Sequence, residues 1–228
     1  MNLEELARKA AAHKRAAVRS LKPTQAAARE RATELWNSGR DHKRQAKQVF
    51  EEREIVNGHH LDLFPTPADL ADRMVSIGDR PGGKWLEPSA GTGRIAQAIL
   101  DAGHTPDCVE LNYNAVKLLQ ERGFNVVHSG DFLEFHGAYD VIIMNPPFSN
   151  LQDIDHVKHA YSLLNPGGRI VAIMSPGPFF RKDKKCVQFR NWVHSKLDYS
   201  EDLPAGTFKA SGTMVAAKLV ILDKSINP

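Results

Sequence analysis

The sequence predicts an α/β fold with a mostly parallel seven-stranded sheet, helices on both faces and an antiparallel last hairpin. Three observations support this prediction. From about residue 82 onward, short β-rich runs alternate with helical segments, which is typical of parallel βαβ units. The runs 141–144 and 170–174 are wholly apolar, as expected of strands covered on both faces. The last two β-rich runs have no helical pattern between them, so we expect them to pair antiparallel.

The expected elements follow in chain order. Five strands are predicted at 84–89, 107–111, 125–129, 139–147 and 169–176. The helices between them are expected to end near Ala102, Arg122 and Leu164. The final hairpin is expected to consist of 198–204 and 215–223, joined by 205–213.

The opening of the chain differs from this pattern. Its first 54 residues hold 13 Lys and Arg against 8 Asp and Glu, whereas the whole chain has a formal net charge of +3. Ala, Arg, Glu, Lys and Gln dominate there, which predicts two or three helices with breaks near Pro23 and Gly39. We therefore divide the chain into a basic helical N-terminal extension, 1–56, and an α/β domain, 57–228. The extension is either a solvated arm or a phosphate-contacting arm, and it offers a surface for a homodimer or a partner subunit.

Composition excludes several classes of protein. With 42% hydrophobic and 25% charged residues, the chain is typical of a soluble globular protein, and it lacks an apolar run long enough for a membrane span. The first residues have no apolar signal-peptide core, so we expect a cytoplasmic protein. Neither Cys108 nor Cys186 has metal-ligand spacing, and no metal is expected. The ten scattered His residues are interpreted as loop or surface residues rather than ligands.

Ligands of open α/β sheets bind at the carboxyl ends of the strands, so the residues that follow each strand are candidates for one shared ligand site. The first strand runs into a glycine-containing turn, 87–93, where the backbone can approach a ligand closely. This turn is neither a GxGxxG fingerprint nor a P-loop. Glu110 ends the second strand, where a carboxylate can accept both ribose hydroxyls. Asp131 and Phe132 follow the third strand and offer a carboxylate for an exocyclic amine and an apolar ring.

The fourth strand ends in Asn145-Pro146-Pro147-Phe148. Two prolines directly after an apolar strand fix the backbone and hold an amide side chain beside an aromatic ring. Any one of these four segments could be a structural turn or a helix cap. Their order along the chain favours one ligand site over four unrelated turns.

At these residues the sequence resembles the class I S-adenosylmethionine-dependent methyltransferases that methylate amines, and is most similar to the N6-adenine DNA methyltransferases. The resemblance covers about Leu61 to Asp223 and implies a Rossmann-like fold. Segment 64–67 resembles the family's segment that closes over the methionine part of the cofactor. Segment 165–168 resembles the turn into the fifth strand, and 210–213 resembles the hairpin near the target base. Asn112 departs from the pattern, because many relatives carry a second acid there.

The resemblance assigns the functional residues, with S-adenosylmethionine as cofactor and no metal. Catalysis is assigned to Asn145, Pro146, Pro147 and Phe148. Cofactor binding is assigned to Phe64, Thr66, Pro67, Glu87, Pro88, Ser89, Ala90, Gly91, Gly93, Glu110, Leu111, Asp131, Phe132 and Asn145. The lone pair of an adenine amine is delocalised into the ring. The Asn145 side-chain oxygen and the Pro146 carbonyl would accept its two N–H bonds, while Phe148 stacks on the flipped base.

The expected function is therefore methyl transfer to the N6 amine of adenine in DNA. Only 13 residues separate Asp131 from Asn145, which leaves no room there for a target-recognition domain, so relaxed sequence specificity is expected. A flexible basic loop with aromatic residues, 179–185, would contact phosphate, unless it is only a solvated loop. Nucleic-acid binding is assigned to Arg181, Lys182, Lys184, Lys185, Lys209 and Ser211. The alternatives are an RNA base-amine methyltransferase, a protein glutamine methyltransferase and an inactive nucleic-acid-binding or assembly subunit.

Overall fold

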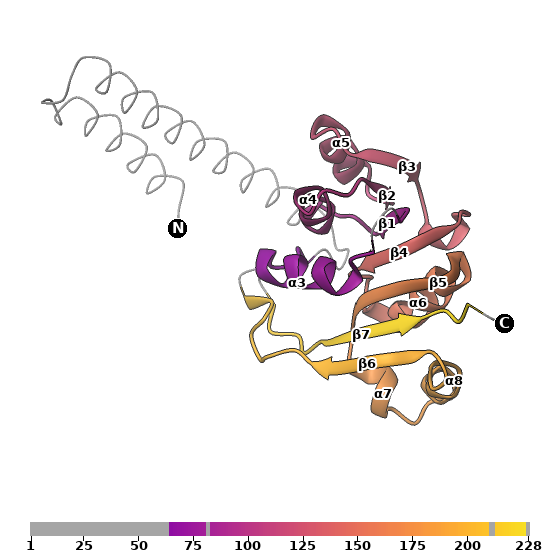
Figure 1. Ribbon diagram of the computed structural model, residues 1–228. Helices are drawn as coiled ribbons and strands as arrows, with labels where there is room; N and C mark the ends of the chain where they lie inside the picture. Colours follow the sequence, from indigo (N-terminus) through magenta and orange to yellow (C-terminus); the bar gives the residue numbers. More distant parts are fainter. Residues whose placement is uncertain (1–63, 81–82, 210–212, 227–228) are drawn as a thin grey trace, which may run out of the picture. The chain divides into compact units, whose positions relative to one another are not determined.

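The computed structural model describes residues 64–80, 83–209 and 213–226 (Figure 1). These ranges form one sheet in the order β3-β2-β1-β4-β5-β7-β6. The proposed N-terminal extension, 1–56, lies outside the described residues, as does Ser211. The strands are β1 Trp85–Pro88, β2 Pro106–Glu110, β3 Asn125–Ser129, β4 Tyr139–Met144, β5 Leu164–Met174, β6 Leu197–Asp202 and β7 Lys218–Asp223.

The strand directions agree with the sequence prediction. Neighbouring strands from β3 to β5 pair in parallel, and β7 lies antiparallel between β5 and β6. The order reverses between β1 and β4, because the chain first builds outward to β3 and then returns. In open α/β sheets such a reversal leaves a crevice at the carboxyl ends of the two strands. The predicted seven-stranded, mostly parallel sheet with an antiparallel last hairpin is confirmed.

Helices cover both faces of this sheet. On one face, apolar residues of α6 and α8, such as Val157 and Phe189, pack in one cluster with Ile142 of β4. On the other face, residues of α3 and α4 such as Met74 pack with Trp85 of β1. The helices are α3 Ala68–Gly78, α4 Arg94–Asp101, α5 Tyr113–Glu121, α6 Gln152–Leu163, α7 Gly177–Phe180 and α8 Lys184–Val193, with short 3-10 turns η1 Phe132–Glu134 and η2 Ser149–Leu151. No helix in the described ranges is long and apolar enough to cross a membrane.

Two elements differ from the predictions. Helix α3, which the sequence analysis did not propose, buries Leu70, Met74 and Gly78, spaced four residues apart on one helical face. Gly78 lets this face approach the sheet, since an added Cβ would lie 2.7 Å from Ile143 Cδ1. Segment 165–168 is not a separate turn, because β5 begins at Leu164 and runs through it. The register between β4 and β5 shifts there, which accommodates the irregular backbone within the strand.

The predicted loop over 179–185 is confirmed only for 181–183, because helices occupy both ends of the segment. Phe180 ends α7, and α8 already begins at Lys184, capped by the Asp183 carboxylate, which accepts from the Cys186 N–H at 3.2 Å. The Arg190 guanidinium donates to the Pro178 carbonyl at 2.9 Å and to the carbonyl of Arg181 at 2.8 Å. Arg181 and Lys182 therefore stand on a hydrogen-bonded turn between two helices, whereas Lys184 and Lys185 stand on the first turn of α8.

Candidate active site

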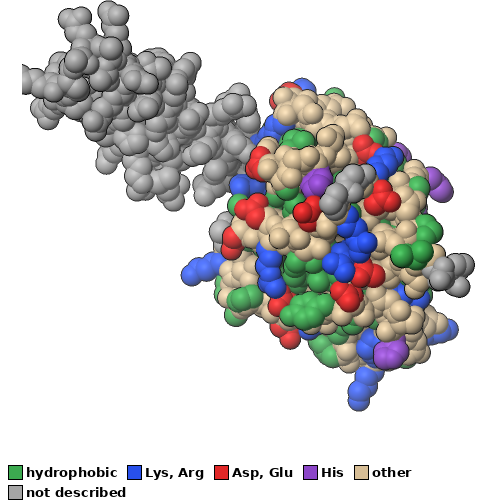
Figure 2. Space-filling model, viewed as in Figure 1, with side chains coloured by type: hydrophobic (Ala, Val, Ile, Leu, Met, Phe, Trp, Pro, Cys, Tyr) green, Lys and Arg blue, Asp and Glu red, His purple; other side chains and the backbone are tan. Residues whose placement is uncertain are grey.

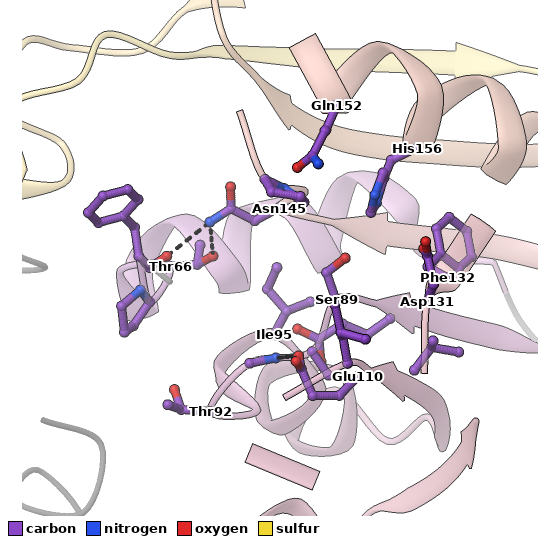
Figure 3. Close-up of a pocket in the computed structure, with 18 of the residues that line it drawn as sticks. Thr66, Ser89, Thr92, Ile95, Glu110, Asp131, Phe132, Asn145, Gln152 and His156 are labelled. Carbon is purple, nitrogen blue, oxygen red and sulfur yellow. Dashed lines mark hydrogen bonds between the residues drawn. The ribbon is translucent and has the colours of Figure 1, made fainter. Parts of the chain in front are cut away.

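A cavity of about 390 Å³ lies at the carboxyl ends of β1 to β4 (Figure 3). Its walls come from the turn after β1, the ends of β2, β3 and β4, and the start of α6. The volume lies in the range of cavities that hold cofactors and drug-sized ligands. The residues assigned to the cofactor that line it are Phe64, Thr66, Glu87, Ser89, Ala90, Gly91, Glu110, Leu111, Asp131, Phe132 and Asn145.

Three of the assigned residues do not line the cavity. Pro67 stands at the N-cap of α3, and Pro88 is buried in β1. Gly93 caps α4 with a φ of +79°, a conformation that favours glycine. A Cβ at Gly93 would lie 2.8 Å from Leu119 Cδ2, so its visible roles are the turn and the close packing of α4 against α5.

Glu110 organises the turn after β1. Its Oε2 accepts from the Gly91 N–H at 2.6 Å, and its Oε1 accepts from the N–H of Asn112 at 2.7 Å. Burial raises the pKa of this carboxyl, and the backbone N–H groups oppose that rise. Asn112 caps α5, because its side-chain oxygen accepts from the N–H groups of Asn114 and Ala115. Asn112, which replaces the second acid of many relatives, thus serves as a helix cap.

Glu87 is the most deeply placed acid of the cavity. It is 3% exposed, and its Oε2 has no partner among the described residues. Burial raises its pKa well above the ordinary value, and the nearby charge of Glu110 raises it further. Glu87 and Glu110 line the cavity together with Asp131, which gives its wall three carboxyl groups. The backbone N–H groups of Ile95 and Ala96 donate to this carboxyl and oppose the rise, but its Oε2 is buried without a partner among the described residues. Such an oxygen beside two further acids suits a ligand that carries positive charge.

Asp131 combines a structural contact with a place on the cavity wall. Its Oδ1 accepts from the Leu133 N–H at 2.9 Å and so caps the short turn η1. The cap uses one carboxylate oxygen, and the residue itself is exposed. The helix-cap interpretation and the ligand interpretation of Asp131 are therefore compatible.

Asn145 holds a defined orientation. Its Nδ2 donates to the Phe64 carbonyl at 3.1 Å and to Thr66 Oγ1 at 3.2 Å, and both bonds are dashed in Figure 3. Both amide hydrogens have acceptors, so the assignment of nitrogen and oxygen follows from the carbonyl partner. The Asn145 Oδ1 remains available as an acceptor.

A second, much smaller cavity adjoins the other side of Asn145. Its volume is about 10 Å³, and Asn145 and Phe64 line both cavities. Phe148 is half-buried on its wall and packs against the cluster beneath α3 and α4. The further lining residues are Pro146, Phe208, Thr213 and Val215.

Sequence reasoning missed one group of lining residues that follows Phe148. Gln152 and His156 stand four residues apart on α6, so both point from one helical face toward the cavity (Figure 3). Their spacing directly after the Asn-Pro-Pro-Phe segment was the available signal. His156 is only 7% exposed, so its interpretation as a loop or surface residue is wrong. Burial lowers the pKa of His156, which keeps the ring neutral near pH 7. Further lining residues, which were not assigned individually, are Pro65, Thr92, Arg94, Ile95, Val109, Gly130, Leu133, Ser149 and Asn150.

The assigned nucleic-acid residues fall into two groups. Arg181 pairs with Asp183 at 2.9 Å, and Lys185 pairs with Asp155 at 2.6 Å. Lys182 and Lys184 are exposed and form no ion pair within the described part of the chain, and Lys209 is also exposed. On the face shown in Figure 2, basic and acidic side chains are interspersed, with no broad patch of one sign. Among the described residues, no group of His, Cys, Asp and Glu could hold a metal ion.

Comparison with known proteins identifies the family. Residues 59–201 match the family model described as "Methyltransferase domain". The chain belongs to this family. Its fold is that of the class I methyltransferases: a class I S-adenosylmethionine-dependent methyltransferase of Listeria monocytogenes is 12% identical, with a TM-score of 0.64, over 93% of this chain and 79% of the other. S-adenosylmethionine, which carries one net positive charge, is the cofactor of this methyltransferase and fits the three-carboxyl cavity.

Other relatives act in different settings. The type IIG restriction endonuclease BpuSI has a TM-score of 0.65 at 16% identity, over 86% of this methyltransferase and 29% of the endonuclease. An RNA methyltransferase of Pyrococcus horikoshii has a TM-score of 0.55 at 22% identity, over 73% and 89%. The defense against restriction protein B of Escherichia phage P1 is 22% identical over 86% of this chain. The chain spans only 10% of the length of that phage protein.

Proposed function

We propose that this methyltransferase transfers the methyl group of S-adenosylmethionine to the exocyclic N6 amine of adenine in DNA. The target base is flipped out of its strand, and sequence specificity is relaxed. The orientation of Asn145 is the observation that supports this proposal best. Its amide nitrogen is occupied by Phe64 and Thr66, so the free oxygen can accept a hydrogen bond from a substrate amine.

The chemistry of an adenine amine requires such an acceptor. The bound cofactor supplies an electrophilic methyl group on a cationic sulfur. The Asn145 Oδ1 and the Pro146 carbonyl accept the two N–H bonds of the amine and draw its lone pair out of conjugation with the ring. Phe148 stacks on the base from the wall of the small cavity. The proton of the methylated amine leaves to water, so no strong general base is needed.

The large cavity is the proposed cofactor site. Glu87 would face the positive charge of the methionine portion, and Glu110 would accept from the ribose hydroxyls. Asp131 would accept from the adenine amine, and Leu111 and Phe132 would supply apolar contacts to its ring. Segment 64–66 lines the same cavity, would lie beside the methionine portion and also holds Asn145, which borders the small cavity.

DNA is favoured over RNA by the kind of relatives found. A restriction endonuclease and a phage protein named for defense against restriction both resemble this chain. The resemblance to an RNA methyltransferase supports an RNA base amine as the second candidate. Relaxed specificity rests on the segments 131–145 and 204–218. Both are short, so few side chains are available to read base edges.

The deciding experiment measures tritiated methyl transfer to duplex DNA, single-stranded DNA and RNA side by side, with nucleoside analysis of each product. We expect N6-methyladenine in DNA. Label in RNA alone, or in a different nucleoside, overturns the proposal. Mapping of the methylated adenines on a plasmid then tests sequence specificity. Modification confined to one recognition site of several defined bases contradicts the proposal that specificity is relaxed.

A further inference from the structure

Phe180 is an exposed aromatic ring at the active-site edge of the sheet. Its side chain is 70% exposed, and it ends α7, the short helix that follows β5. Helix α7 begins against the segment that follows Phe148, because a Cβ at Gly177 would lie 3.6 Å from Leu151 Cδ2. The start of α7 therefore lies beside the segment that follows the proposed base-stacking residue, and the described residues leave most of the Phe180 ring uncovered.

The backbone beneath this ring is held firmly. The adjacent Phe179 packs edge-on against Phe189, with ring centroids 5.8 Å apart. The Arg190 guanidinium binds two carbonyls of the turn, one on each side of Phe180 in sequence. A rigid support of this kind lets an exposed ring press on a ligand without being displaced.

Positively charged side chains follow the ring in sequence. Arg181 and Lys182 follow it directly, Lys184 is the first residue of α8, and all three are exposed. Basic side chains project at the lower edge of the molecule in Figure 2, where Figure 1 places α7. An apolar ring beside several cations suits a duplex, in which phosphates border a stack of bases.

We propose that Phe180 inserts into the base stack of duplex DNA and fills the space left by the flipped adenine. This inference rests on the proposed function, since a wedge is needed only where a paired base must leave the stack. Lys182 and Lys184, with Arg181 from its surface pair with Asp183, contact phosphates next to the insertion. Phe179 has no part in the contact, because its partly buried ring packs against Phe189.

The test uses a duplex with a single adenine, made from one strand with one adenine and no thymine and its complement. Methyl transfer is compared on this duplex, on the same duplex with the adenine opposite cytosine, and on the single strand. For Phe180→Ala we expect a loss of about 5- to 140-fold on the paired duplex, the worth of one stacked ring. The loss should be smaller on the mismatch and absent on the single strand.

Control variants separate the wedge from general damage. Phe180→Trp should keep duplex activity, because it keeps a stacking ring. Tyr199→Ala removes another exposed ring, 46% exposed in the middle of β6, and should have no effect. A 2-aminopurine at the target position should brighten with the wild-type protein and S-adenosylhomocysteine, but much less with Phe180→Ala.

Each other outcome has a distinct meaning. Equal duplex activity of Phe180→Ala and the wild type overturns the wedge and favours a protein partner for this ring. Equal loss on duplex and single strand also overturns it, because Phe180 would then contact the strand itself. If the wild type methylates none of the three DNA forms, the proposed function fails, whatever the variant does.

Discussion

Replacing Thr66 by valine tests whether the orientation of Asn145 matters for methyl transfer. The change removes the hydroxyl that accepts from Asn145 Nδ2 at 3.2 Å and keeps the side-chain shape at a position that is 4% exposed. The Phe64 carbonyl remains as one acceptor, so the amide is loosened rather than released. A neutral hydrogen bond contributes about 0.5–1.5 kcal/mol. If this contribution is realised in the transition state, kcat falls about 2- to 13-fold.

Steady-state kinetics with an adenine-containing DNA strand measure the effect. We expect a lower kcat, a nearly unchanged KM for S-adenosylmethionine and recovery in Thr66→Ser, which restores the hydroxyl. A double-mutant cycle supplies the control: in an Asn145→Ala background, Thr66→Val should change kcat no further, because the amide that it positions is absent. Two results refute the reasoning, namely an unchanged kcat in Thr66→Val, or a raised KM alone, which would make Thr66 a cofactor contact only.

Three further predictions address the rest of the site. Asn145→Ala should lower kcat by about 10²–10³, while calorimetry shows cofactor binding close to the wild type; turnover near wild type would contradict the mechanism. Asp131→Ala should weaken calorimetric binding of S-adenosylmethionine and S-adenosylhomocysteine by at least about tenfold, and unchanged affinity would remove Asp131 from the adenine site. Glu87 has a raised pKa in the folded state, so its contribution to stability is complete below its ordinary pKa of 4.5 and is lost as pH rises toward the folded-state pKa. The melting temperature of Glu87→Gln should therefore gain on that of the wild type as the pH rises above the ordinary pKa of 4.5, and a constant difference would contradict this.

Much of the fold could be predicted because its signals are local. Apolar runs such as 141–144 identify buried strands by themselves, and the lack of a helical pattern over 205–213 is enough to predict the antiparallel hairpin. Helix α3 carries a regular apolar spacing. It was not predicted, because it directly follows segment 64–67, which was interpreted as part of the ligand site. The helical ends of segment 179–185 were not predicted, because the turn between them depends on a distant residue. The Arg190 guanidinium donates hydrogen bonds to two carbonyls earlier in the chain.

The cavity shows a similar division. Acids and glycines at strand ends could be predicted, because parallel strands bring their carboxyl ends to one edge. His156 could not be predicted with the same ease, since its burial depends on how α6 packs over Phe132, with ring centroids 5.6 Å apart. Gly93 was predicted to bind the cofactor. The neighbouring side chain of Leu119 leaves no space for a Cβ, which explains why glycine stands at this position.

The orientation of Asn145 depends on residues distant in sequence. Its two acceptors precede it by 81 and 79 positions, so no local pattern contains them. Phe64 lines the large cavity, borders the small one and also supplies a carbonyl to Asn145. One short segment therefore touches the proposed cofactor, the proposed base site and the acceptor between them. A cofactor that orders segment 64–66 also fixes the amide of Asn145, so part of the cost of positioning the acceptor is met before the base arrives.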